Sequence, residues 1–314
     1  MLMEPSRQIE LHDLVQSEAD RARFELRNQE LFPENIALTS DVPSARRVVD
    51  RFNAYWLTVE PLASALVTGC AWGSGDHAAL WTQAVRAVAS TVDGPRSGNT
   101  YLLAIQEYPV QALVYAAALG AMARKNYTSL KAVTVDPTVR YNRDRNSVIS
   151  YMAPHYVESF KIAANLLAVT TNGAKVEDSA VADWFQRGGM RHTPISDHLH
   201  DLLAPLLKDL VPDQEDYSDL FDETEVLLGA LAVDAYLQAQ KESRYVGRQW
   251  YGRFTWRYRH SDRPLHHRIQ AEFEAQGSNW PPLKAGLFDG SAERAAAALD
   301  EYCDRGDRVV ESLW

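Results

Sequence analysis

The chain has 314 residues, of which 46% are hydrophobic and 24% charged, and its formal net charge is −10. This composition matches that of soluble globular proteins and excludes an intrinsically disordered chain. The length allows one large domain or two of ordinary size. The acidic balance argues against a protein that coats nucleic acid or an anionic membrane over its whole surface. The two cysteines, Cys70 and Cys303, lie far apart, which argues against a disulfide scaffold or a zinc site.

The amino-terminal residues do not resemble a secretory signal, because residues 1–30 mix acids and bases and lack a continuous apolar segment. The longest apolar stretch, residues 112–123, is also too short to span a bilayer, which takes about twenty residues. We therefore expect this stretch to be a buried core helix. We also expect a cytoplasmic protein that makes no contact with a membrane.

Helical periodicity dominates the chain from its start. The segment 7–31 alternates acids and bases around a few apolar residues and predicts a solvated, peripheral helix. Asp41 is suited to cap a second helix, whose apolar residues recur at steps of three and four. Pro61 should bend or divide this helix, and Gly69 or Gly73 should end it.

Further elements follow in the same manner. The segment 93–99 is rich in Gly, Pro, Ser and Asn and predicts a loop. A nearly all-apolar helix should start near Pro109 and end at Asn126. Residues 137–150 contain three arginines and little apolar material, which indicates an exposed connector. More helices are predicted at residues 154–169, 178–185, 196–210, 219–241, 264–275 and 292–313.

About ten helices without a convincing series of strands predict an all-α fold, either a single bundle or an irregular α-solenoid-like array. No internal repeat of fixed period is visible, which disfavours a regular solenoid. We expect a peripheral helix within residues 1–40 and a helical domain in residues 41–314. Within that domain, residues 41–136 and 151–314 are candidate sub-blocks.

The most unusual segment runs from Arg244 to Arg268. It holds seven arginines, three histidines and six aromatic residues, and Asp262 is its only acid. Between Arg253 and Arg259 basic and aromatic side chains alternate, which favours an extended strand, although the spacing of the rings also fits a helix. Arginine forks and aromatic rings together indicate a binding surface. The candidate binding residues are Arg248, Trp250, Arg253, Trp256, Arg257, Arg259 and Arg263.

Three interpretations of this segment remain open. Arginines can contact phosphates while rings stack on bases, as in nucleic-acid binding. Trp, Tyr and Arg also dominate the hot spots of protein interfaces, so the partner could be another protein or a second copy of the chain. The third interpretation is internal, because residues 209–225 contain eight acids and no base and could dock on this segment. The acidity of the whole chain makes nucleic acid the least favoured of the three.

Two weak catalytic patterns define the enzymatic alternatives. His200 and Asp201 resemble the metal-binding dyad of HD-type phosphohydrolases, although nothing in the sequence selects the further ligands that such a centre needs. A simpler interpretation is a helix start at which Ser196 or Asp197 caps the first turn. His198 and His200 are two residues apart and would point to different sides of that helix.

Arg253 and His260 match the Arg–His spacing of HEPN-type ribonucleases, which are also all-helical. In a segment so rich in both residue types, this spacing arises readily by chance. Glycine-rich phosphate loops, Walker-type lysines and dinucleotide fingerprints are missing from the sequence. We therefore expect a non-catalytic binding or regulatory module without cofactor or metal, and an all-helical nuclease or phosphohydrolase is the alternative.

Several short motifs together resemble the helical region that follows the effector domain in multidomain bacterial proteins of antiphage defence. The motifs are AWG (71–73) with LW (80–81), EYP (107–109) with LVYA (113–116), GRFTWR (252–257) and AGLF (285–288). In that family the effector domain is often sirtuin-like or of the TIR type. The resemblance implies that most of the chain, from about residue 45 onward, is a sensor or adaptor region that acts with a partner protein. It assigns no catalytic residue.

Overall fold

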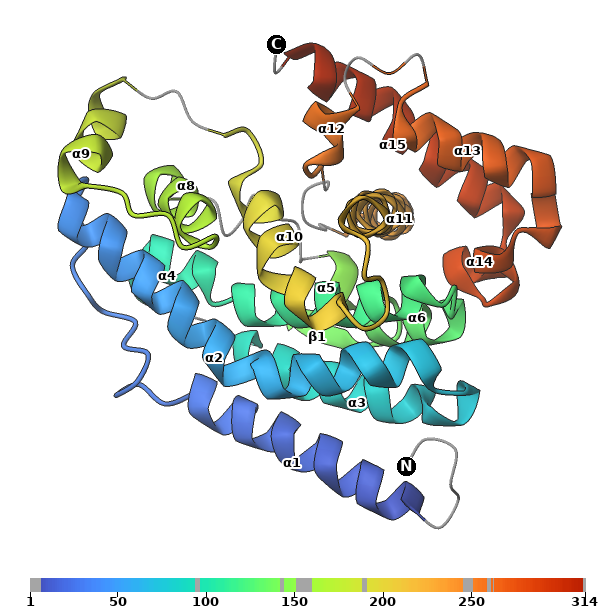
Figure 1. Ribbon diagram of the computed structural model, residues 1–314. Coiled ribbons are helices and arrows are strands. Elements are labelled where there is room, and N and C mark those ends of the chain that lie inside the picture. Colours follow the sequence, from blue (N-terminus) through green and yellow to red (C-terminus); the bar gives the residue numbers. More distant parts are fainter. Residues whose placement is uncertain are drawn as a thin grey trace.

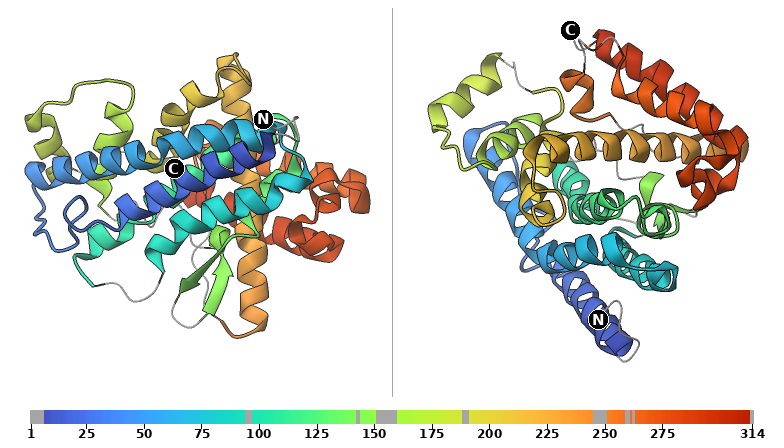
Figure 2. Two further views of the ribbon diagram at one scale, coloured as in Figure 1. Left: turned by 90° about the horizontal axis from the view of Figure 1, so that it is seen from below. Right: turned by 45° about the vertical axis from the view of Figure 1, so that its right-hand side comes forward.

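The computed structural model describes residues 7–93, 97–141, 144–150, 160–187, 191–244, 251–258, 261 and 263–312. Nearly all regular structure among these residues is helical, and one two-stranded antiparallel sheet accompanies it. The predicted all-α class is confirmed. Figures 1 and 2 show helices stacked in successive layers, with the amino terminus at one end of the stack and the carboxyl terminus at the other.

The outermost layer is α1 (Gln8–Leu26), which packs along α2 (Val42–Trp72) and α3 (Ala78–Ala89) (Figure 1). The start of α2 is the predicted one, because the carboxylate of Asp41 accepts a hydrogen bond from the backbone N–H of Ser44 at 2.8 Å. The short 3-10 helix η2 (Gly75–His77) then leads into α3.

Pro61 lies inside α2 but does not divide it, and α2 runs as one α-helix from Val42 to Trp72. Proline has no N–H, so the carbonyl of Leu57 loses its partner one turn earlier. Leu57 is 66% exposed and Pro61 is also exposed, so water can reach the carbonyl that the proline leaves without a partner. Of the two effects expected of Pro61, a bend or a division, the division is not found.

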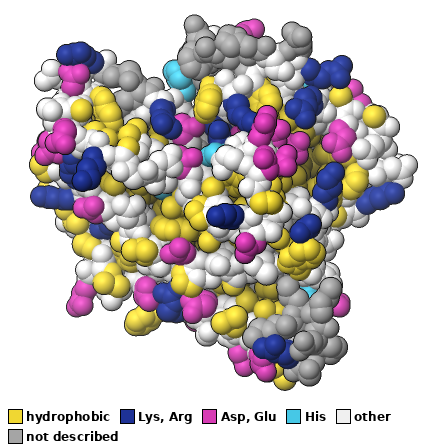
Figure 3. Space-filling model, viewed as in Figure 1, with side chains coloured by type: hydrophobic (Ala, Val, Ile, Leu, Met, Phe, Trp, Pro, Cys, Tyr) yellow, Lys and Arg dark blue, Asp and Glu magenta, His cyan; other side chains and the backbone are white. Residues whose placement is uncertain are grey.

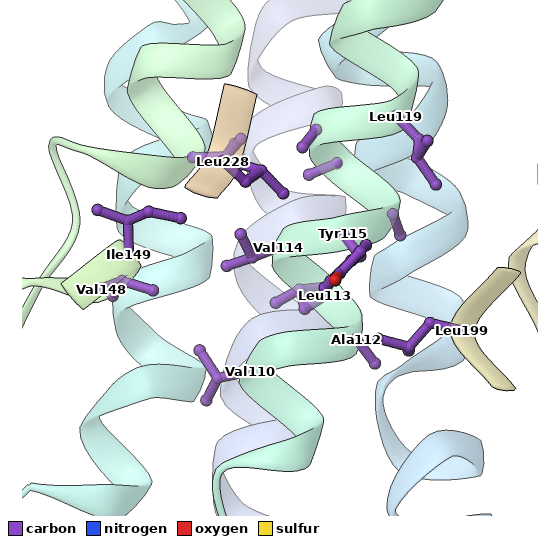
Figure 4. Packing of buried hydrophobic residues seen from close by; sticks show 14 of the residues in the cluster. Val110, Ala112, Leu113, Val114, Tyr115, Leu119, Val148, Ile149, Leu199 and Leu228 are labelled. Atoms are coloured by element: carbon purple, nitrogen blue, oxygen red, sulfur yellow. The ribbon is translucent and has the colours of Figure 1, made fainter. Parts of the chain in front are cut away.

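The core is built around α5 (Tyr108–Ala123), a helix that is buried over nearly its whole length. It lies between α4 (Thr100–Ile105) and α6 (Tyr127–Thr134), two short helices that the sequence pattern did not reveal. Figure 4 shows side chains of α5 pointing toward Leu199 on one side and toward Ile149 on the other. The prediction of a buried core helix in residues 112–123 is confirmed.

The joined span Thr100–Ala123 is long and apolar enough to cross a membrane by length and composition. However, 78% of its apolar window is buried inside the protein. Burial on all sides explains why its hydrophobic residues do not alternate with polar ones, since no face of the helix meets water.

Residues 137–150 do not form the exposed connector that their arginines indicated. Strand β1 (Thr138–Tyr141) pairs antiparallel with β2 (Asp144–Ser147), and the 3-10 helix η4 (Val148–Ser150) follows. The residues of η4 are buried, and η4 packs on the long helix α11. The prediction is wrong because the buried apolar residues of this segment are too few to show a period.

The helices expected after residue 160 are present, with ends shifted by a few residues, and the expected start at residue 154 lies outside the described residues. They are α8 (Lys161–Thr170), α9 (Asp178–Arg187), α10 (Pro194–Leu207), α11 (Gln214–Lys241), α13 (Leu265–Gln276) and α15 (Ala292–Ser312). Figure 1 views α11 end-on and Figure 2 shows it lengthwise, between α5 and the pair α13 and α15. The buried apolar residues form one cluster that reaches from Leu11 in α1 to Tyr302 in α15.

Between α11 and α13, the alternating segment forms a single helical turn, α12 (Phe254–Arg257), rather than a strand. A second short helix, α14 (Pro281–Lys284), separates α13 from α15. The alternation of rings and arginines favoured a strand, and this prediction is therefore wrong. The four-residue spacing of the rings, which fitted a helix, matches the structure better.

Candidate functional site

The basic and acidic segments meet where α12 rests on α11. We call this contact the α11–α12 junction and define it by Asp219, Asp222 and Glu225 of α11 and the facing residues 252–258. Figure 3 shows acidic side chains gathered over the end of α11 that faces the viewer. The structure thus contains the internal contact that the charges of the two segments allowed.

Glu225 is the central residue of the junction and is completely buried. Its Oε1 accepts hydrogen bonds from the hydroxyl of Tyr115 at 2.7 Å and from that of Ser196 at 2.6 Å. Its Oε2 accepts one from the backbone N–H of Arg253 at 3.0 Å, and the same N–H lies 2.9 Å from Ser196 Oγ. One carboxyl group therefore joins α5, α10, α11 and the start of α12.

Gly252 is required at this position by the carboxyl group of Glu225. A Cβ atom on Gly252 would lie 2.0 Å from Oε2 and 2.1 Å from Oε1 of Glu225, far inside van der Waals contact. A residue without a side chain lets the backbone approach the carboxyl group closely. This close approach explains why the first residue of the GRFTWR motif is glycine.

Burial controls the protonation of this carboxyl group. It raises the pKa of Glu225 to about 8, against the hydrogen bond from Ser196, which lowers it. Near neutral pH the group is therefore largely protonated, and it loses its proton as the pH rises through about 8. The junction consequently contains an acid that titrates close to physiological pH.

The side chains of Arg253 and Arg257 face a second buried acid, Asp222. Arg257 Nη1 donates to Asp222 Oδ2 at 2.7 Å and also lies 2.9 Å from Asp219 Oδ1. Arg253 Nε is 3.7 Å from Asp222 Oδ1, too far for a hydrogen bond, and its Nε and Nη1 are buried without an acceptor. Burial raises the pKa of Asp222 to about 6 despite both arginines.

The buried charges of this junction contribute little net stability. The desolvation of buried charges offsets much of their mutual attraction, whereas the loss of one partner leaves an uncompensated charge. The unsatisfied N–H groups of Arg253 add to the cost of the docked arrangement. The contact of α12 with α11 is thus specific in geometry but sensitive to changes in charge.

The histidines of α10 are bound within the protein. His198 contacts Tyr108 Oη at 2.7 Å and Thr171 Oγ1 at 2.6 Å, and burial lowers its pKa to about 3. His200 contacts Asp201 Oδ1 at 2.8 Å and Ser218 Oγ at 3.0 Å. The two rings point to different neighbours, as the two-residue spacing indicated.

Among the described residues, His200 and Asp201 are not joined by a third side chain that could complete a shared metal site. Both ring nitrogens of His200 are already engaged in hydrogen bonds. The predicted capping role of Ser196 is also not found, because α10 begins at Pro194 and the Ser196 hydroxyl binds Glu225.

The second catalytic pair, Arg253 with His260, is only half visible, since His260 lies outside the described residues. Arg253 is 8% exposed, and its guanidinium lies 5.9 Å from the ring centre of Phe221 and 5.5 Å from that of Trp256. In this arrangement Arg253 faces acids and rings of its own chain rather than solvent.

The predicted binding residues separate into three groups. Arg248, Trp250 and Arg259 lie outside the described residues. Arg253 and Arg257 are held by the acids of α11. Trp256, at 37% exposure, and Arg263 reach the surface.

Sequence reasoning did not single out Glu225 or Gly252 as partners. Glu225 was one acid among eight in residues 209–225, and its hydrogen-bond partners come from distant parts of the chain. The sequence did contain one signal for Glu225. This residue directly precedes the apolar run 226–228, which puts an ionisable group on the buried side of a helix.

Comparisons with protein-family models, with curated proteins and with solved structures found no significant match to this chain.

Proposed function

We propose that this chain is a binding and regulatory module that recognises a protein partner through the exposed part of the segment 244–268. The observation that carries the proposal is the position of Trp256. Its ring reaches the surface from a helical turn whose preceding backbone N–H is fixed by Glu225 and Ser196. Rigid, partly exposed tryptophans of this kind are typical anchors of protein interfaces.

The side chain beneath this ring supports the same interpretation. Arg253 lies under Trp256 at 5.5 Å from the ring centre, so a cation–π contact favours one orientation of the ring. A side chain that is ordered before binding loses less conformational entropy when a partner covers it.

Two exposed arginines that follow α12 in the sequence favour an acidic partner surface. Arg263 is exposed, and Arg268 of α13 is 48% exposed and lies 3.9 Å from Glu223. An exposed pair at that distance is weak, so Arg268 can pair with carboxylates of a partner at small cost. The proposed partner is therefore a protein with an acidic patch around an apolar pocket.

The sequence resemblance places this proposal in a biological setting. If the chain is the sensor or adaptor region of an antiphage defence system, its partner is an effector protein. The GRFTWR motif, one of the motifs that carry the resemblance, supplies both the glycine that admits Glu225 and the tryptophan proposed as anchor. The proposed role is to bind and restrain such an effector.

Co-purification with the products of the adjacent genes tests the proposal. The tagged chain is co-expressed with each neighbour, and the amount of bound partner is measured together with the oligomeric state of the chain alone. We expect one neighbour to bind stoichiometrically. Trp256→Ala and Arg263→Glu should each reduce the bound amount at least about tenfold, as expected for hot-spot positions.

Trp72→Ala is the matched control, because Trp72 is also exposed, at 48%, and also stacks with an arginine, Arg124. It lies in α2, outside the segment 244–268, and its replacement should leave binding unchanged. The proposal fails if neither a neighbouring product nor a second copy binds, or if the Trp256 and Trp72 variants behave alike.

A further inference from the structure

A cluster of two histidines and one aspartate lies between α13 and α15, outside the α11–α12 junction. We call His266, His267 and Asp307 the His–His–Asp cluster. One ligand atom from each residue can be chosen so that the atoms lie within 4.8 Å of one another. His266 is 1% exposed, whereas His267 and Asp307 are partly open to solvent, so the cluster has a buried side and an accessible side.

The geometry points to a divalent metal site of the zinc class, and we propose that the His–His–Asp cluster binds such an ion through two imidazoles and one carboxylate. Asp307 Oδ1 is 2.9 Å from His266 Nε2 and 3.1 Å from His267 Nε2. Ligand atoms about 2.0–2.2 Å from a tetrahedral zinc ion are separated by roughly 3.3 Å. The two histidine–aspartate distances are therefore within a few tenths of an ångström of those in a zinc site, and the three ligand atoms together lie within 4.8 Å of one another.

The ligand types determine which ions fit. Imidazole nitrogen suits zinc, iron, copper and nickel, whereas magnesium and calcium prefer an all-oxygen shell. Two nitrogens and one carboxylate oxygen thus favour a transition metal. Three protein ligands leave at least one coordination position for water or a small ligand.

That position has space beside it. A cavity of about 240 Å³ is lined by His266 and Asp307, by Glu311 one helical turn further along α15, and by residues of α12. The cavity can admit water to the ion, and Glu311 adds a second carboxylate on the same wall. The site therefore resembles open metal sites more than closed structural ones.

The ring of His267 has an outer-shell partner of the kind that orients metal ligands. Its Nδ1 faces Gln270 Oε1 at 3.4 Å, and Gln270 Nε2 donates to Asp300 Oδ1 at 2.7 Å. This chain would keep the proton on Nδ1 and direct the lone pair of Nε2 to the ion. The Nε2–H of His266 donates to Asp307, and its Nδ1 atom is buried without a hydrogen-bond partner, so this ring would have to carry its proton on Nδ1 to coordinate the ion.

Metal binding to the full-length, EDTA-treated chain tests the proposal. We expect Zn²⁺ to raise the melting temperature, Co²⁺ to give visible d–d absorption, and Mg²⁺ to do neither. His267→Ala and Asp307→Asn should each weaken Co²⁺ binding at least about 100-fold, and Gln270→Ala, which removes only an outer-shell contact, about tenfold.

His12→Ala is the matched control, because His12 on α1 is an exposed histidine beside an aspartate, Asp13, at 3.6 Å. It should leave the Co²⁺ spectrum and affinity unchanged. Cys303→Ser should also leave them unchanged, which excludes the thiolate one turn before Asp307 as the ligand.

Circular dichroism establishes that each variant is folded, and Asp307→Asn decides the question if His267→Ala does not fold. The proposal is overturned if the wild-type chain shows neither a Zn²⁺-dependent melting shift nor a Co²⁺ spectrum. It is also overturned if folded His267→Ala and Asp307→Asn bind Co²⁺ as tightly as the wild type.

Discussion

The contact between α2 and α5 and the contact between α11 and α12 both depend on a glycine, but the glycines face different chemistry. At Gly120 an added Cβ would meet the backbone of α2, at 2.3 Å from the carbonyl oxygen of Val67. At Gly252 it would meet the ionisable carboxyl group of Glu225. At the first contact, backbone atoms limit how closely the two helices approach. At the second, the limit is a carboxyl group that can gain or lose a proton.

The difference shows how one chain combines core packing that does not depend on pH with a contact, between α12 and α11, that does. The α2–α5 contact contains no titratable group at its closest approach, so pH should not change it. At the α11–α12 junction, the free energy of docking depends on the proton of Glu225 and on the pairing of Asp222. The segment that carries Trp256 is therefore attached through the more adjustable of the two contacts.

The largest effect is expected for Gly120→Ala. The added methyl group would collide with backbone atoms of α2 that cannot rotate away, so the free energy of unfolding should fall by about 3 kcal/mol or more. Urea unfolding at two pH values measures this loss, which should be the same at both. Gly75→Ala is the control, since a Cβ there meets nothing closer than 3.9 Å.

Gly252→Ala should destabilise by a smaller amount, about 2 kcal/mol, because the side chain of Glu225 can move where a backbone cannot. A double-mutant cycle with Glu225→Ala identifies the cause. The double variant should lose less stability than the sum of the two single variants, since removal of the carboxyl group vacates the space. Strict additivity would contradict the close contact between Gly252 and Glu225.

Glu225→Gln should change the pH dependence of stability. The native pKa of about 8 is raised above the unfolded value, so this group favours the folded state below the unfolded pKa and loses that effect as pH rises through about 8. Wild-type stability should fall by about 1 kcal/mol between pH 6.5 and 7.5, at up to ~1.4 kcal/mol per pH unit for one proton. The variant should give a flatter curve over this interval.

Glu242→Gln is the control for that experiment, because Glu242 is 61% exposed and pairs only with the nearby Arg244 among the contacts of the described residues. Its pH profile should follow the wild type. An equally steep profile for Glu225→Gln would show that another group is responsible for the pH dependence.

The smallest effect on stability is expected for Arg263→Glu. Arg263 is exposed, and surface substitutions away from buried contacts usually change the free energy of unfolding by less than about 0.5 kcal/mol. Thermal unfolding measures this change. A loss comparable to that of Gly252→Ala would mean that Arg263 belongs to the junction rather than to the binding surface.

Local signals in the sequence predicted much of the helical architecture. Asp41 and Gly73 bound α2 as expected, and the continuous apolar composition of residues 112–123 identified the core helix. The hairpin β1–β2 was missed because a strand pair with few apolar residues carries no period. The helices α4 and α6 were missed because six and eight residues are too few to establish one.

The site was predictable only in part. Opposite charge correctly paired residues 209–225 with the arginine-rich segment, since charge complementarity can be read without coordinates. The sequence could not show which arginines would pair with these acids and become buried, because burial depends on how the helices pack. The side chains of Glu225, Ser196 and Tyr115 meet only after three separate helices have packed.

The central place of α5 also has a consequence for biosynthesis. Its apolar side chains are covered on one side by α2, which leaves the ribosome earlier, and on others by α10 and α11, which leave it later (Figure 4). A nascent chain that ends before α11 therefore exposes part of the apolar surface of α5 to solvent or to a chaperone. Synthesis must pass Leu228, more than a hundred residues after α5 begins, before this surface is enclosed.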